Sequence, residues 1–291
     1  MPKSTVVTAP AELLAYLFAT WPGERKKQIR TWLKYQAVSV NGRPTTQFDH
    51  PLKPGDTVAI RSDRSAIPKA VLGSGMKIYF EDATVIVIEK PADLLSTASE
   101  AEQEKTAYFQ LTTYLRENKP RNPERAWIVH RLDRETSGLM VFAKTAAAKT
   151  ALQAGWDKVT KVYEAVVEGN LLTDQGTFAS HLDETSPFKV YSARPGERTR
   201  LAITHYRVLQ RTKGRTLVEL TLETGRRHQI RVQLADAGCP IVGDEKYGAK
   251  TDPAKRLALH ARTLKFTHPV TKQELGFESP LPRELSRLVS V

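Results

Sequence analysis

The pattern of apolar and polar positions divides the chain into a short front part with helical periodicity and a longer part with strand periodicity. In the front part, apolar residues recur at helical spacing in two runs, Leu13, Leu14, Leu17 and Phe18 and then Ile29, Trp32 and Leu33. This spacing predicts two helices, separated by the helix-breaking WPGE. Two short strands are expected after them, VSV before an Asn-Gly turn and TVAI after Pro-Gly-Asp.

The stretch that follows the front part has no sustained period and contains Pro68, Gly73 and Gly75. Such a stretch is typical of a linker. We therefore predict a front domain over residues 1–62, a linker over 63–76 and a large domain over 77–291.

Short apolar runs of the strand type dominate the large domain. They are IYFEDATVIVIEK, AWIVH, LMVFAK, VYEAVVEG, LAITHYRVL and TLVELTLETG. Helical spacing is clear over residues 106–118 and after Arg227, where Ile230, Leu234 and Ala237 share a face. Because strands outnumber helices and do not alternate regularly with them, the predicted class is α+β with a mixed, mostly antiparallel sheet.

The charge of the chain favours a polyanionic partner. There are 44 Lys and Arg against 32 Asp and Glu, a net charge of +12, which is typical of proteins that bind nucleic acid, although some basic enzymes bind none. Residues 1–76 hold half of this excess, with 11 basic and 5 acidic side chains. In the second predicted helix, Lys26, Arg30 and Lys34 repeat every four residues, so this basic stripe is either an RNA contact or a solvated face.

The single cysteine, Cys239, excludes an intrachain disulfide and any metal site built from several thiolates. It fits a reducing compartment, so we expect a cytoplasmic protein. The early apolar run over residues 11–19 contains Glu12 and is too short to span a bilayer, so no membrane or secretion segment is expected.

One carboxylate, Asp133, stands between two arginines in the loop between AWIVH and LMVFAK. Positive charge on Arg131 and Arg134 is expected to lower its pKa, which suits a nucleophile or a structural anchor better than a proton donor. An aspartate in such a turn is also a common turn-former or ion-pair partner. The small residues 136–138 that follow are expected to give a substrate close access to the carboxylate.

Two further segments have candidate functional residues. Alternation in KVYEAVVEG places Tyr163 on one strand face, where it is either a core residue or, beside a cleft, a platform for stacking a nucleobase. In LETGRRHQIRVQL, Arg226 and Arg227 are expected at the start of a helix, where the helix dipole is unfavourable for cations. An anion, either a phosphate or Asp133, is therefore expected nearby, unless the pair is simply exposed.

Known metal and nucleotide motifs are absent from the sequence. His130, His228 and His260 do not have the HExxH or paired-ligand spacing of a zinc site, and neither GxxxxGK[ST] nor a strand-borne GxGxxG occurs. We therefore expect chemistry by protein side chains alone.

The large domain resembles the RluA-type pseudouridine synthases. HRLDRETSGLMVFAK resembles the signature of that family, LETGRRHQIR its later arginine motif, and KPADLLSTAS, GCPIVGDEKYG and RLALHARTLKFTHP its other segments, in the expected order over about residues 77–280. The front part, about residues 10–62, resembles the S4 RNA-binding domain, a frequent companion in that family.

This resemblance implies a sheet with a central cleft, in which a uridine is flipped out of its RNA and its base is detached, rotated and rejoined through carbon. Asp133 corresponds to the nucleophile, which attacks carbon 6 of the base or carbon 1 of the ribose. Tyr163 corresponds to the base-stacking tyrosine, a candidate for removing the carbon 5 proton, and Arg226 to the arginine that ion-pairs with the nucleophile. Arg131 corresponds to the residue that enters the RNA stack, and Arg134 has no assigned role. Such an isomerisation needs no cofactor.

The S4-like part favours large ribosomal RNA as the substrate, with transfer RNA or a non-catalytic ribosome-assembly role as alternatives. We expect a monomer. Family members usually continue HQIR with a pair ending in histidine, where this chain has Val232 and Gln233, so contacts to the RNA are expected to differ while activity survives. The sequence does not identify the target uridine.

Overall fold

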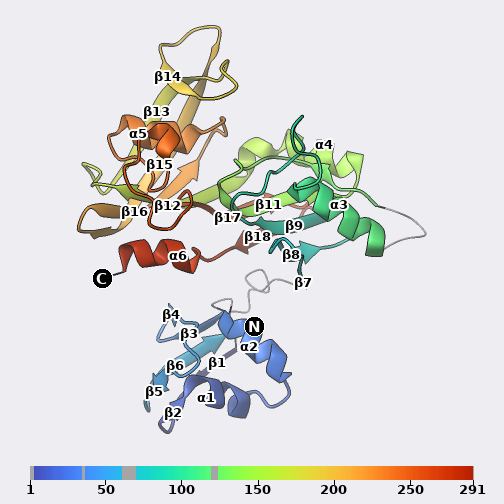
Figure 1. The fold of residues 1–291 in the computed structure, drawn as a ribbon. Helices are drawn as coiled ribbons and strands as arrows, with labels where there is room; N and C mark the ends of the chain where they lie inside the picture. Colours follow the sequence, from blue (N-terminus) through green and yellow to red (C-terminus); the bar gives the residue numbers. More distant parts are fainter. Residues whose placement is uncertain (1–2, 35–36, 61–69, 119–123, 291) are drawn as a thin grey trace. The chain divides into compact units, whose positions relative to one another are not determined.

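The computed structural model describes residues 3–34, 37–60, 70–118 and 124–290 (Figure 1). The chain divides into two compact units, an N-terminal unit up to Lys69 and a large unit from Ala70 to Val291. Among the described residues, no helix is long and apolar enough to cross a membrane.

The N-terminal unit packs two helices against a small antiparallel sheet. The helices are α1 (Leu13–Thr20) and α2 (Lys26–Lys34), and the sheet has the order β1 (Lys3–Val6), β6 (Thr57–Ile60), β3 (Val38–Val40) and β4 (Arg43–Pro44). A separate pair joins β2 (Ala11–Glu12) to β5 (Pro51–Leu52). The core contains the apolar residues that the helical spacing predicted, among them Leu13, Leu17, Ile29, Trp32 and Leu33.

The predicted Asn-Gly turn joins β3 to β4. Both Asn41 and Gly42 have positive φ, 50° and 76°, which suits the tight hairpin turns that follow the twist of the strands. The Asn41 side chain also accepts a hydrogen bond from the backbone N–H of Thr57 at 2.8 Å, which ties the turn to β6.

The large unit is built on one mixed sheet. Its strand order is β14 (Tyr191–Ala193), β13 (Gln175–Asp183), β15 (Thr199–Thr212), β16 (Arg215–Leu222), β12 (Thr160–Glu168), β17 (Leu259–Thr267), β11 (Ser137–Ala143), β9 (Val85–Lys90), β8 (Lys77–Glu81) and β7 (Ala70–Val71). In addition, β10 (Trp127–Ile128) pairs with β11 and β18 (Glu274–Glu278) with β17. Only the β11–β17 pair is parallel among these pairings, which confirms the predicted α+β class with a mostly antiparallel sheet.

The predicted linker over residues 63–76 ends earlier in the structure. Ala70–Val71 form β7, which pairs with β8, and Met76 is fully buried in the core. Residues 63–69 lie outside the described residues.

Helices flank the sheet (Figure 1). They are α3 (Ala107–Asn118), α4 (Ala146–Ala154), α5 (Gln229–Asp236) and α6 (Arg283–Ser286), with short 3-10 turns at Trp156–Lys158, Glu245–Tyr247 and Arg287–Val289. The sequence predicted α3 and α5. It did not predict α4, although residues typical of both helix ends were present. Thr145 caps the start by accepting a hydrogen bond from the Ala148 N–H at 3.1 Å, and Gly155 ends the helix.

Helix α5 is fixed to the sheet by two buried glutamines. Gln229 donates to the Ile203 carbonyl and the Thr204 hydroxyl of β15, at 3.0 and 2.9 Å. Gln233 accepts from Thr204 at 2.6 Å and donates to the carbonyl of Ala202 at 3.0 Å. The side-chain amide of Gln233 is thus hydrogen-bonded within the protein, which makes Gln233 a structural residue. Its buried position does not support the expectation that it changes contacts to RNA.

Candidate functional site

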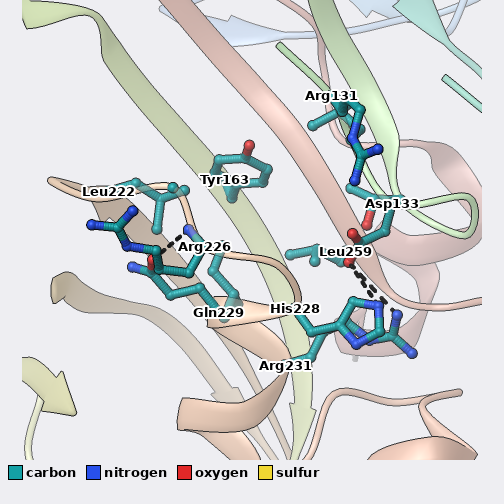
Figure 2. Close-up of a pocket in the computed structure, with 13 residues that line it drawn as sticks. Arg131, Asp133, Tyr163, Leu222, Arg226, His228, Gln229, Arg231 and Leu259 are labelled. Atoms are coloured by element: carbon teal, nitrogen blue, oxygen red, sulfur yellow. Dashed lines mark hydrogen bonds and ion pairs between the residues drawn. The ribbon is translucent and has the colours of Figure 1, made fainter. Parts of the chain in front are cut away.

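A cleft of about 620 Å³ opens in the large unit beside the start of β11. The loop before β11 contributes Arg131 and Asp133, strand β12 contributes Tyr163, and the connection from β16 to α5 contributes Arg226 and His228. The structure therefore brings the predicted residues of the large domain into one cavity (Figure 2).

Buried side chains hold the loop that contains Asp133. Lys90, at the end of β9, donates to the carbonyls of Pro91, Leu94 and Arg134 at 2.9, 2.7 and 3.0 Å. Burial lowers the pKa of this lysine to about 7. The three bonds tie the KPADLLSTAS segment to the Asp133 loop, so Arg134 serves this loop through its backbone.

Two more contacts fix the same loop. The Ser96 hydroxyl donates to the carbonyl of Leu132 at 2.6 Å and accepts from its N–H at 3.1 Å. The His130 ring accepts from the Val141 N–H of β11 at 3.1 Å and packs on Trp156. Burial lowers the pKa of His130 to about 3, so the ring is neutral and structural.

The arginine that reaches Asp133 is Arg231. Its guanidinium lies 3.6 Å from Asp133 Oδ2, 3.5 Å from Glu135 and within 2.8 Å of both oxygens of Asp244. Assigning this ion pair to Arg226 was wrong. The side chain of Arg226 donates to the carbonyl of Leu201 at 3.1 Å and points away from Asp133 (Figure 2).

The expectation of a low pKa for Asp133 was also wrong. Burial is the largest influence and raises the pKa of Asp133, Glu135 raises it further, and Arg231 and Lys90 only partly oppose this. Arg131 and Arg134, the neighbours in sequence, are both exposed, and neither is among the main influences on the pKa of Asp133. The carboxylate nevertheless keeps 25% of its side-chain surface exposed, so a substrate can reach it.

Tyr163 lies on the opposite side of the cleft from Arg231 (Figure 2). It is partly buried on β12, where it packs against two apolar clusters of the core. Burial and the charge of Asp133 raise the pKa of its phenol, which therefore stays protonated at neutral pH.

His228 completes the site. From the sequence it was considered only as a metal ligand, and that role was rejected. Its Nε2 lies 4.0 Å from Asp133 Oδ2, and its Nδ1 is hydrogen-bonded to the Tyr247 hydroxyl at 2.8 Å. Burial, together with Arg231, lowers the pKa of the ring to about 4, so it is neutral. Its φ of 53° lies in the left-handed region, which is uncommon for a residue with a side chain and often marks functional sites.

Arg226 and Arg227 do not open a helix as predicted, because α5 begins only at Gln229. Arg227 instead binds the loop after β13, where its guanidinium donates to the carbonyls of Glu184, Ser186 and Pro187. The anion expected beside the pair was a phosphate or Asp133, but the carboxylate that lies there is Glu184, which accepts from the backbone N–H of Arg227.

Of the small residues after Asp133, Thr136 lines the pocket around the carboxylate, whereas Ser137 and Gly138 serve the sheet. Ser137 and Gly138 are both buried, and Gly138 has a φ of +123°. A Cβ at Gly138 would lie 2.3 Å from the carbonyl oxygen of Ala261 in β17. Glycine is therefore needed here because two strands approach closely.

His260, the third histidine considered and rejected as a metal ligand, is fully buried on β17. It is hydrogen-bonded to the Ser137 hydroxyl at 2.8 Å and to the Ser279 hydroxyl at 3.0 Å. Among the described residues, no group of three or more His, Cys, Asp or Glu side chains is arranged to hold a metal.

The basic stripe lies on the N-terminal unit. Lys26 and Arg30 are exposed on α2, and both cations approach the ring of Phe18, at 5.8 and 5.6 Å. Lys34 is the last residue of α2, and its side chain lies outside the described part of the structure.

Comparison with known proteins gives consistent matches. The family model for RNA pseudouridylate synthase matches residues 84–236. The chain is 34% identical over 281 residues to the uncharacterized RNA pseudouridine synthase YlyB of Bacillus subtilis, covering 94% of this chain and 91% of that protein. It is 33% identical over 312 residues to ribosomal large subunit pseudouridine synthase D of Escherichia coli K12, covering 96% and 89%.

A solved structure has a similar fold. Human RNA pseudouridylate synthase domain containing 4 matches with a TM-score of 0.61 and 27% sequence identity, covering 72% of this chain and 90% of that one.

Proposed function

The chain belongs to the RNA pseudouridylate synthase family and is an RNA pseudouridine synthase, and on that premise we propose that Asp133 is its nucleophile. The reaction breaks the bond between the ribose and nitrogen 1 of the base and forms a bond from the ribose to carbon 5, while carbon 5 loses its proton and nitrogen 1 takes one up. One observation carries the proposal: the partly exposed carboxylate of Asp133 lines the same pocket as Tyr163, with the guanidinium of Arg231 at 3.6 Å. It attacks carbon 6 of the base or carbon 1 of the ribose.

The other residues of the cleft have supporting roles in this proposal. Tyr163 stacks on the flipped base, and its raised pKa supports stacking over proton removal. Arg231 takes the ion-pairing role that the sequence suggested for Arg226. Arg131, exposed at the cleft, enters the RNA stack in place of the uridine.

We propose ribosomal RNA of the large subunit as the substrate. The support is the name of similar proteins from Escherichia coli and Neisseria meningitidis, ribosomal large subunit pseudouridine synthase D. We further propose that the N-terminal unit is an S4-like RNA-binding domain that uses the basic stripe of α2, and that the protein acts in the cytoplasm as a monomer without a cofactor. Transfer RNA remains the alternative substrate.

The experiment that tests this function maps pseudouridines in ribosomal and transfer RNA from cells with and without the gene, using a reagent that marks pseudouridine selectively. We expect a site in large-subunit RNA that disappears with the gene. It should return with the wild-type protein and not with Asp133→Asn, while the purified variant still binds RNA. Conversion by Asp133→Asn would remove this residue from the mechanism, and an unchanged map would favour a non-catalytic RNA-binding role.

A further inference from the structure

An exposed aromatic side chain lies on a loop that borders the cleft. This loop, residues 184–190, joins β13 to β14, and we call it the rim loop. The side chain of Phe188 is 79% exposed, and Tyr191, just after the loop, is 54% exposed. Single exposed apolar residues are ordinary on protein surfaces, so exposure alone carries no functional meaning.

The rim loop is held firmly, so it presents Phe188 in a defined position. Arg227 binds three of its carbonyls, and Lys246 donates to the carbonyl of Phe188 itself at 3.1 Å. The Tyr247 hydroxyl accepts from the Val190 N–H at 3.0 Å. A rigid loop loses little conformational entropy when a ligand binds to it.

The rim loop is continuous with the reaction site. Glu184 and Arg227 line the same cleft as Asp133. Tyr247, which holds the loop at Val190, is also hydrogen-bonded to His228 beside the carboxylate. A chain that enters the cleft therefore passes close to this loop.

The sequence around Phe188 has a small excess of positive charge. Residues 183–200 contain Lys189, Arg194, Arg198 and Arg200 against Asp183, Glu184 and Glu197. Lys189 lies 5.5 Å from the ring centroid of Tyr191 and 5.1 Å from that of Tyr247. Exposed aromatic rings among cations are the arrangement that binds single-stranded nucleic acid, because rings stack on bases while cations follow the phosphates.

We propose that Phe188, assisted by Tyr191, stacks on an unpaired base of the RNA next to the target uridine. The rim loop would then hold the strand on one side of the flipped nucleotide. This inference rests on RNA being the substrate, but it does not depend on which residue is the nucleophile.

The test measures binding of the full chain carrying Asp133→Asn, so that no turnover occurs. The probes are a fluorescent 12-nucleotide oligouridylate and a blunt RNA duplex of the same length. Adding Phe188→Ala should weaken binding of the single strand roughly 5- to 100-fold and change duplex binding little, because only unpaired bases expose their faces. Phe188→Trp should restore binding. Since stacking releases no ions, the slope of log affinity against log salt should stay the same.

Leu172→Ala is the matched control, because Leu172 is fully exposed on the same unit and lies outside the cleft lining. It should bind both probes as the parent does. Equal single-strand affinity with and without Phe188, or an equal loss for the duplex, would overturn the proposal. A change in oligomeric state with Phe188→Ala would instead make this residue a contact between copies of the chain.

Failure of this proposal can be distinguished from failure of the proposed nucleophile. The binding comparison is made entirely within the Asp133→Asn background, whereas the nucleophile is tested by conversion with Phe188 intact. Each result therefore stands independently of the other.

Discussion

Replacing Gly138 with alanine tests whether the close approach of β11 to β17 holds the large unit together. The added Cβ would lie 2.3 Å from the oxygen and 2.5 Å from the nitrogen of Ala261, both backbone atoms. Neither can rotate away as a side chain would. The φ of +123° adds strain of about 1–3 kcal/mol for any residue with a Cβ, and overpacking in a close-packed core costs a similar amount. We expect a total loss of about 2–6 kcal/mol.

This loss is measurable as a fall in melting temperature. For a unit of this size, each kcal/mol lowers the Tm by about 2–4 °C, so Gly138→Ala should unfold about 4–24 °C below the wild type. The turn before β11 contains Asp133, so kcat should also fall at temperatures where the variant is still folded.

Gly155→Ala serves as the control for Gly138→Ala. Gly155 ends α4 with a φ of −104°, and an added Cβ would find its nearest neighbour at 3.9 Å. This substitution should leave the Tm nearly unchanged. If Gly138→Ala melted within 2 °C of the control, the strands would be able to separate at little cost, and the proposed reason for glycine would be refuted.

Four other changes have expected outcomes. Asp133→Asn should raise the free energy of unfolding at pH 7, because a carboxyl whose pKa is raised in the folded state destabilises the fold when it ionises. Denaturant titrations should show that this gain disappears below pH 3.8, the ordinary pKa of an aspartate, where the wild-type carboxyl is protonated in both the folded and the unfolded state. His228→Gly should keep or raise the Tm by relieving the left-handed backbone, yet lower kcat about tenfold; wild-type activity would limit His228 to a backbone role. Tyr163→Phe should keep RNA affinity while Tyr163→Leu weakens it roughly 5- to 100-fold in a binding titration, and an equal loss in both would argue against stacking. The double variant Lys26→Ala/Arg30→Ala should lower the slope of log RNA affinity against log salt concentration by up to about two, and the control Lys213→Ala should leave this slope unchanged. An unchanged slope in the double variant would mean that the stripe is only solvated.

Local patterns were enough to predict much of the fold. Helical spacing identified the two N-terminal helices, α3 and α5, because the apolar face of each helix must be buried. Strands β13 and β14 were not predicted. Along β13 the positions alternate only between exposed and partly exposed, with Leu182 alone buried, and β14 is fully exposed, so neither strand has the alternation of buried and exposed residues that marks a half-buried strand. Their pairing is determined by long-range contacts that no short window contains.

The candidate site was found from its motifs, but its internal contacts were not. The arginines next to Asp133 in sequence do not make the ion pair with it, since Arg131 and Arg134 are both exposed and Arg231 is the cation at 3.6 Å. Arg231 reaches Asp133 because α5 begins three residues later than predicted and therefore presents a different face. The spacing of apolar residues does not reveal this later start, because the backbone of His228 is left-handed and residues before it do not continue the helix.

The arrangement around Arg231 explains how Asp133 can lie beside a guanidinium and still have a raised pKa. The fork of Arg231 is taken up by Asp244, which binds it with two hydrogen bonds at 2.7 and 2.8 Å and is almost fully buried. Glu135 competes for the same cation at 3.5 Å, so one positive charge is shared among three carboxylates. Asp133 is thus attracted at 3.6 Å without the bidentate hydrogen bonds that would fix its position and lower its pKa further. A carboxylate held loosely in this way can move toward a substrate carbon without first breaking a strong ion pair, which fits the role of nucleophile that we propose for Asp133.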